Sequence, residues 1–273
     1  MGSGIGRPGP AALVALGVSV VATLVTLGGV GGTALLGFDC YPLIAASKVS
    51  SFGDLVGTFG EELMDGRYPD GRFYRPLVHL SFAFDHATGG LAPARYFATA
   101  LAIVALAGWV IGLLAAQLVG SGANTRARVT ASLVATLAFV LHRAQLDVVP
   151  YAARRADALA ILFVALTALA AARGARAWLV ALPALFALLS KESGVIAVPV
   201  AFAFAFAREG VGAAAAARAT LAPFAAVALG VALRTAILGG LGGHAESGAA
   251  GAQNASAVAA GTFKVGDEVL ALP

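Results

Sequence analysis

Charged residues are scarce in this chain. They make up 12% of its 273 residues, whereas hydrophobic residues make up 59%, and a typical soluble domain is roughly 25% charged. The mean hydropathy is +0.87. So little polar surface cannot cover a globule in water, but lipid solvates an apolar exterior without cost. The scarcity of charge therefore excludes an ordinary soluble domain and indicates an integral membrane protein.

Cysteine and lysine are also rare. The single cysteine, Cys40, excludes an intrachain disulfide framework. Most cations are arginines, and they are scattered between apolar runs rather than clustered. The basic pI of about 9.6 is therefore better explained by membrane topology than by nucleic-acid binding, and we expect no nucleic-acid partner.

Apolar runs recur along the chain, and about twenty apolar residues cross a bilayer as a helix. We predict an all-α membrane fold with about seven transmembrane helices, although the fifth and sixth runs are short. A hairpin is favoured for these two, because Lys191 and Glu192 would otherwise lie at mid-bilayer depth, at about 2.5–3.5 kcal/mol each. The predicted spans cover residues 11–37, 96–119, 129–141, 158–172, 177–189, 194–207 and 220–238.

The longest polar stretch covers residues 38–94, and we predict that it is a first loop outside the cytoplasm. Within it, residues 73–86 read FYRPLVHLSFAFDH. Apolar and polar side chains there separate onto different helical faces, which predicts an interfacial amphipathic helix with Pro76 in its first turn. The membrane domain then covers residues 1–243, and the Gly/Ala/Ser-rich residues 244–273 are expected to form a further periplasmic loop.

The arginines predict the orientation of the chain. With a cytoplasmic N-terminus, the short cytoplasmic loops carry many arginines and one acid, Glu209. The opposite side is the periplasm in a bacterium, so we expect a multi-pass protein of the bacterial inner (cell) membrane. The arginines in these loops are Arg7, Arg126, Arg128, Arg173, Arg176, Arg208 and Arg218.

Ionisable residues at the edges of the spans are the candidate functional residues. In the predicted topology they share the periplasmic face, where cations could neutralise a lipid phosphate and a carboxylate could take a proton from a polar acceptor. Structural explanations stay open, such as a solvated helix end for Asp39, a span anchor for Arg155 and an N-cap for Asp157. The candidates are Asp39, Arg75, Asp85, Arg155, Asp157, Lys191 and Glu192.

Four motifs follow one another with apolar runs between them: GFDCYPLI at 37–44, YPDGRFYRPLVHLSFAFDHATGGLAPARYF at 68–97, LHRAQLDVVPYAARRADALA at 141–160 and LLSKESGVIAVP at 188–199. The first is similar to F/Y-D-D-x-x-x-I, and the last to L-S-K-E-x-x-x-x-x-P. The third is similar to L-H-P-x-H-x-E-A-V followed by G-R-A-D-L-L-A. Together they resemble the GT-C class of polyprenyl-phosphate-sugar-dependent glycosyltransferases, especially the transmembrane, tetratricopeptide-repeat O-mannosyltransferases and their bacterial relatives.

The resemblance implies a GT-C-like fold that transfers a mannose-like sugar from a polyprenyl-phosphate lipid to a hydroxyl of a protein or envelope glycan. Asp39 takes the position of the family's catalytic aspartate, a general base that acts with inversion. Asp157 and Glu192 would orient the cations that hold the phosphate. Asp85 is a further candidate residue of the substrate-binding site. A divalent cation, Mg²⁺ or Mn²⁺, is left open as a cofactor. The candidate phosphate-binding cations are Arg75, Arg155 and Lys191.

The chain also departs from the family pattern. Cys40 stands where the family often has a second acid, which keeps a non-catalytic, lipid-binding or assembly relative as an alternative. A transporter is disfavoured, because the predicted spans are apolar at their centres. The family usually has more spans and often a repeat domain, so we expect this chain to be partial. Other departures are Arg143, Gln145, Asp147 and Arg154.

Overall fold

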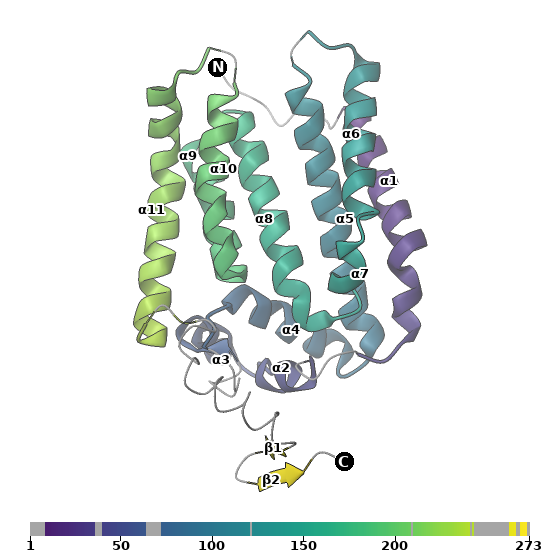
Figure 1. Ribbon diagram of the computed structural model, residues 1–273, viewed down its shortest axis with the longest axis vertical. Helices are drawn as coiled ribbons and strands as arrows, with labels where there is room; N and C mark the ends of the chain where they lie inside the picture. The colour runs from purple at the N-terminus through teal and green to yellow at the C-terminus, as the bar shows by residue number, and fades with distance from the viewer. Residues whose placement is uncertain are drawn as a thin grey trace.

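A computed structural model describes residues 9–35, 40–63, 72–120, 122–208, 210–240 and 242, and the backbone of residues 262–265 and 268–271. The regular structure of these residues is helical apart from one pair of short strands. Long helices run side by side in one bundle, and short helices lie across one end of it (Figure 1).

The bundle helices form from the apolar runs of the sequence. Each run predicted as a span overlaps one of them, and most of these helices begin a few residues before the predicted run. α1 packs against α5 and α6 at one side of the bundle, whereas α11 packs against α9 and α10 at the other side. These helices are α1 (Pro10–Leu27), α5 (Pro93–Leu118), α6 (Thr125–Val140), α8 (Arg155–Ala172), α9 (Ala177–Ser190), α10 (Ala197–Phe206) and α11 (Ala213–Leu238).

Short elements, many of them from the polar segment 38–94, cover the end of the bundle at which α8 begins (Figure 1). α4 starts at Pro76, as predicted, because proline lacks only an N–H that the first helical turn leaves unpaired anyway. A 2.8 Å hydrogen bond between His79 Nε2 and the carbonyl oxygen of Ala46 ties α4 to α2. The short elements are η1 (Gly28–Gly32), α2 (Cys40–Ala46), α3 (Phe52–Gly57), η2 (Thr58–Gly60), α4 (Pro76–Gly89), α7 (Ala144–Val148), η4 (Ala152–Arg154) and η5 (Glu192–Ile196).

Four stretches of the described chain are long and apolar enough to cross a membrane. They support the prediction of a helical membrane protein, whereas the count of seven spans stays a prediction. α6, α9 and α10 have 16, 14 and 10 residues, and 14 residues reach about 21 Å, short of the roughly 30 Å hydrocarbon core. The four stretches are Ala12–Gly32, Pro93–Leu118, Ala152–Ala172 and Ala213–Leu238.

The segment predicted as a C-terminal loop contains two short strands, β1 (Thr262–Val265) and β2 (Glu268–Ala271). They pair antiparallel, with Thr262 opposite Ala271 and Val265 opposite Glu268. The β-branched and aromatic residues among TFKV and EVLA favour extended backbone. The glycine- and alanine-rich composition of the whole segment 244–273 instead predicts a loop.

Two glycines of α5 allow its close packing against neighbouring helices. A Cβ built on Gly108 would lie 2.6 Å from Ser19 Oγ of α1, and one on Gly112 would lie 2.3 Å from Thr136 Oγ1 of α6. Ser19 Oγ donates a 2.6 Å hydrogen bond to the carbonyl oxygen of Ala105. Small residues four apart are a common device for bringing membrane helices together, and here they seat α5 in the bundle.

We expect Gly112→Ala to destabilise the bundle by about 1–3 kcal/mol, because the added methyl group overlaps Thr136 and the backbone of Ser132. Thermal unfolding of the detergent-solubilised protein would measure the loss. Gly17→Ala is the matched control, because a Cβ on Gly17 of α1 meets nothing within 4 Å and should leave stability unchanged or slightly raised. Equal unfolding temperatures for the two variants would contradict the role of Gly112.

Candidate functional site

The structure brings the predicted charged residues together at one end of the bundle. Arg75 precedes α4 and Asp85 lies within it, Arg155 and Asp157 begin α8, and Lys191 and Glu192 join α9 to α10. Six of the seven candidates therefore lie where α4 crosses the ends of the long helices. The seventh, Asp39, lies outside the described residues. Those six candidates form three sets of ion pairs.

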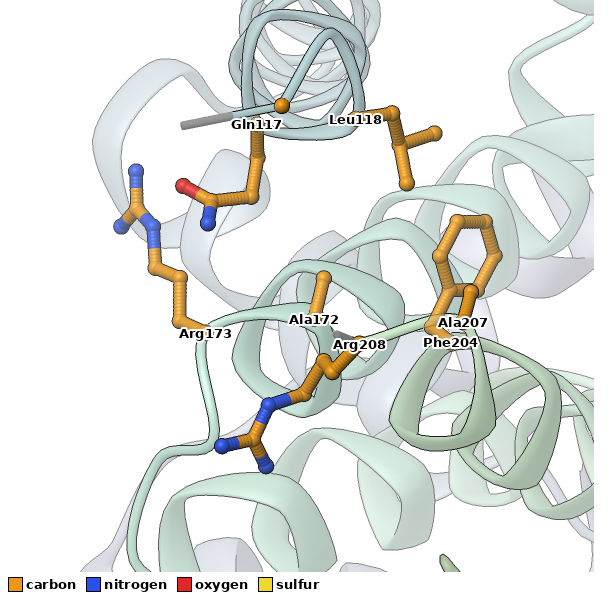
Figure 2. Close-up of a pocket in the computed structure, with 8 residues that line it drawn as sticks. Gln117, Leu118, Ala172, Arg173, Phe204, Ala207 and Arg208 are labelled. Carbon is orange, nitrogen blue, oxygen red and sulfur yellow. The ribbon is translucent and has the colours of Figure 1, made fainter. Parts of the chain in front are cut away.

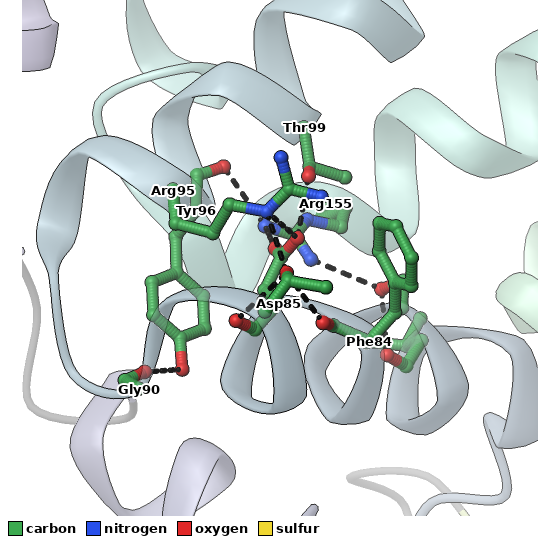
Figure 3. A network of polar contacts seen from close by, with 10 residues as sticks. Phe84, Asp85, Gly90, Arg95, Tyr96, Thr99 and Arg155 are labelled. Atoms are coloured by element: carbon green, nitrogen blue, oxygen red, sulfur yellow. Dashed lines mark hydrogen bonds and ion pairs between the residues drawn. The ribbon is translucent and has the colours of Figure 1, made fainter.

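Asp85 and Arg155 form the most deeply buried of these pairs (Figure 3). Both side chains are 0% exposed, and Arg155 Nη2 lies 2.6 Å from Asp85 Oδ2. The same Nη2 atom donates a 2.9 Å hydrogen bond to the carbonyl oxygen of Tyr96, and Thr99 donates one to Asp85. The guanidinium group also stacks over the ring of Phe82, 4.4 Å from its centroid.

This enclosed pair joins three helices, because Asp85 belongs to α4, Tyr96 and Thr99 to α5, and Arg155 to α8. A buried charge costs several kcal/mol unless an opposite charge and hydrogen bonds compensate it. With no exposed surface, Arg155 positions α4 instead of offering a free cation to a ligand.

Cys40, at the start of α2, lies beside this network. Its side chain is fully buried and is close enough to Arg155 to interact with it electrostatically. α2 also packs against α4 and η4. The residue that follows Asp39 in the chain is therefore held next to the Asp85–Arg155 pair.

Glu192 holds two arginines from opposite parts of the chain. Arg75 donates to both of its carboxylate oxygens, at 3.2 Å from Nε and 2.8 Å from Nη2. Arg234 Nη1, from α11, donates to it at 2.9 Å. Burial alone would raise the pKa of Glu192, but the hydrogen bonds and charges of the two arginines outweigh it and lower that pKa from 4.5 to about 2.

Lys191 and Asp157 form the third pair, which is more open to its surroundings. Lys191 Nζ donates a hydrogen bond to Asp157 Oδ1. Their side chains remain 29% and 38% exposed, in contrast to the fully enclosed Asp85 and Arg155. Lys191 can therefore exchange its partner for an incoming anion without moving a helix.

Gly194 fixes the turn that carries Lys191 and Glu192. Its amide donates a 2.8 Å hydrogen bond to the carbonyl oxygen of Lys191. A Cβ on Gly194 would lie 2.1 Å from the carbonyl carbon of Ala187, inside the backbone of α9. Only glycine allows η5 to fold back this closely on α9, and that contact determines where the two charged side chains point.

An apolar groove of about 400 Å³ starts at Asp157 and Ser193 and follows α8 along its length. Ile161 and Val164 of α8 line its middle, and Phe204 of α10 lines its far end. Ala168, the last residue of α8 in the groove, lies eleven positions after Asp157, which corresponds to about 16 Å of helix. The half-open Lys191–Asp157 pair therefore lies at the mouth of a long apolar channel.

The described carboxylates of the site do not fit a metal centre. Asp85 faces Arg155, Asp157 faces Lys191, and Glu192 faces two arginines. Within the ranges that the structure describes, no group of three His, Cys, Asp or Glu side chains could hold a metal ion. No step is assigned to the divalent cation that the resemblance leaves open.

Sequence reasoning missed Arg234 and Gly194. A signal for Arg234 was present, because an arginine inside an apolar run calls for a partner at the same depth. The sequence contains no signal for Gly194, because the role of this glycine arises from the close approach of η5 to α9. Comparisons with protein-family models, with curated proteins and with solved structures found no match for this chain, so its function is inferred from the site together with the sequence motifs.

The Glu192 cluster predicts a specific pH dependence of stability. The pKa of Glu192 is lower in the folded chain, so its contribution is complete above about pH 4.5 and is lost as the pH falls toward about 2. We expect Glu192→Gln to destabilise the protein by about 1–3 kcal/mol at pH 7, because it leaves two cations facing each other.

Thermal unfolding in detergent between pH 7 and pH 3 would measure this effect. The difference between the wild type and Glu192→Gln should narrow at acidic pH. Asp147→Asn is the control, because Asp147 is an exposed carboxylate of α7. A gap between the wild type and Glu192→Gln that stays constant over the whole range would contradict the role of the charge.

Proposed function

We propose that this chain is a membrane glycosyltransferase that moves a mannose-like sugar from a polyprenyl-phosphate donor to a hydroxyl group of a protein or envelope glycan. The observation that carries the proposal is the half-open Lys191–Asp157 pair at the mouth of the apolar groove along α8. A donor of this class combines an anionic phosphate with a long apolar chain, and the site offers a cation next to an apolar channel.

Each of the three ion-pair sets has a different proposed role, which depends on how exposed its cation is. Lys191 is the candidate for direct contact with the phosphate, because its ammonium group is partly exposed. Arg75 is held by Glu192 and keeps 17% of its side chain exposed, so it adds positive charge nearby. Arg155 is enclosed, and its proposed role is therefore to hold α4 in place.

The proposed reaction is a direct displacement. Asp39 takes the proton of the acceptor hydroxyl while its oxygen attacks the anomeric carbon of the sugar. The bond from that carbon to the phosphate oxygen breaks, and the polyprenyl phosphate leaves with the bonding electrons. Lys191 would stabilise the charge that develops on the departing phosphate.

The distribution of arginines supports the proposed topology. The loops joining α5 to α6, α8 to α9 and α10 to α11 lie at the end of the bundle away from α4 (Figure 1). Arg126, Arg173 and Arg208 lie in or next to these loops, which would be cytoplasmic. The proposed arrangement has about seven spans, a cytoplasmic N-terminus, the interfacial helix α4 and a periplasmic active face in a bacterial inner membrane.

The alternative is a non-catalytic relative that binds the lipid or assists assembly. One observation favours it: Cys40 occupies a buried position where the resembled family often has a second acid. Such a protein would bind the lipid donor through the same groove and Lys191 but would not transfer the sugar. Measuring donor binding and sugar transfer separately distinguishes the two functions.

Transfer of labelled mannose from polyprenyl-phosphate mannose, followed in membranes that contain the protein, tests the proposal. Asp39→Asn should reduce transfer by about 10²- to 10⁴-fold while membrane insertion is kept. Lys191→Met should weaken binding of the donor, because the phosphate loses its cation. Glu61→Gln is the control, as it neutralises an exposed acid of the same segment.

Full transfer by Asp39→Asn would refute the assignment of the base. A wild type that binds the donor but transfers no sugar would support the non-catalytic alternative instead. A wild type that binds no donor would refute both functions.

Cysteine labelling tests the topology. Cys40 is fully buried, so the probes are Lys48→Cys and Arg176→Cys, two exposed positions at opposite ends of the bundle, in a Cys40→Ser background. In bacterial spheroplasts, a membrane-impermeant maleimide should label Lys48→Cys directly and Arg176→Cys only after permeabilisation. The reverse pattern would overturn the proposed orientation.

A further inference from the structure

A second cavity lies at the end of the bundle opposite the ion-pair cluster. It has a volume of about 310 Å³ and lies where α5, α8 and α10 end. Figure 2 shows Gln117, Arg173 and Arg208 around it, each from a different helix end. Leu118 and Ala172, which also line it, are the last residues of two candidate membrane spans. The cavity therefore lies at the depth at which the spans meet the lipid headgroups.

Two exposed arginines line this cavity. Arg173 and Arg208 are exposed and form no ion pair with any residue in the described ranges. Arg218 adds a third cation, because it lines a neighbouring cavity of about 250 Å³ together with Arg208. This arrangement contrasts with the other end of the bundle, where the predicted cations already face carboxylates.

The turn between α8 and α9 is shaped to hold Arg208. Gly174 has a φ of +62°, and a Cβ at that position would lie 2.4 Å from the guanidinium carbon of Arg208. Gly174 and Arg208 both line the neighbouring cavity of about 250 Å³, so a side chain on Gly174 would displace this guanidinium group from its place beside that cavity. The guanidinium group therefore packs against the backbone of this turn, while the side chain as a whole stays exposed.

The cavity adjoins the apolar groove. Phe204 lines both the cationic cavity and the far end of the groove, whose wall there is completed by Ala168 and Val200. An anion held at the rim that Arg173 and Arg208 line would therefore have apolar side chains next to it, along α8 and α10. A small soluble anion would leave these side chains uncovered, whereas an anionic lipid would cover them with an acyl chain.

We propose that this cavity binds an anionic phospholipid, with its phosphodiester at the rim that Arg173 and Arg208 line and an acyl chain against Phe204 in the groove. The ligand class follows from the two guanidinium groups, which have no ion pair within the described ranges, from the depth of the cavity and from the apolar groove next to it. The proposal shares the apolar groove with the glycosyltransferase proposal, but its headgroup site lies at the opposite end of the molecule and uses a different set of charges, so each can fail without the other.

Native mass spectrometry of the detergent-solubilised protein tests this site, with phosphatidylglycerol and the zwitterionic phosphatidylcholine as probes. The wild type should retain phosphatidylglycerol in preference to phosphatidylcholine. Arg173→Gln combined with Arg208→Gln should lower that retention by roughly 10- to 30-fold, because each near-surface arginine contributes to the attraction. The matched control combines Arg126→Gln with Arg176→Gln, which removes two exposed arginines at the same end that do not line the cavity.

Three outcomes would overturn the proposal. A wild type without preference for phosphatidylglycerol would refute the site whatever the variants do. Equal losses in both double variants would assign the effect to the overall positive charge of this end. Displacement of phosphatidylglycerol by millimolar glycerol 3-phosphate would show a site for soluble anions, because the acyl chain would then contribute nothing.

Discussion

The ion pair between Asp85 and Arg155 fastens α4 to the starts of α5 and α8, and the geometry of this end of the molecule depends on it. Both side chains are completely enclosed, so neither charge is tolerable without the other. The backbone oxygen of Tyr96 and the hydroxyl group of Thr99 complete the network. This contact fixes the C-terminal half of α4, whereas the hydrogen bond of His79 and the pair of Arg75 with Glu192 hold its first half.

Exposure separates the charges that hold the fold from those that are free to bind. Arg155 has no open surface, whereas Lys191 and Asp157 retain about a third of theirs. The Glu192 cluster lies between these extremes, because Arg234 is nearly buried while Glu192 is 30% exposed. A ligand phosphate can replace Asp157 as the partner of Lys191 without breaking a helix contact. The same replacement at Arg155 would dismantle the junction of three helices.

The sequence was informative about helices and about which charges share an end of the bundle. Long apolar runs form helices because lipid leaves no other way to satisfy the backbone, and α4 begins at Pro76 as its pattern predicts. The exact pairings were not predictable. Glu192 takes Arg234 as a second partner only because α11 returns beside η5, and Gly112 seats α5 only because α6 packs there. Such contacts depend on tertiary neighbours, which local spacing does not encode.

The two ends of the bundle differ in how their charge is compensated, and the groove along α8 connects them. At one end the predicted cations are matched by Asp85, Asp157 and Glu192. At the other end Arg173 and Arg208 face a cavity without a described acid. The groove along α8 is lined mainly by apolar side chains. An amphiphile that enters it from either end of the bundle would therefore leave its charged group at that end. Chain length and headgroup charge, rather than hydrogen bonding along the groove, would then select what binds.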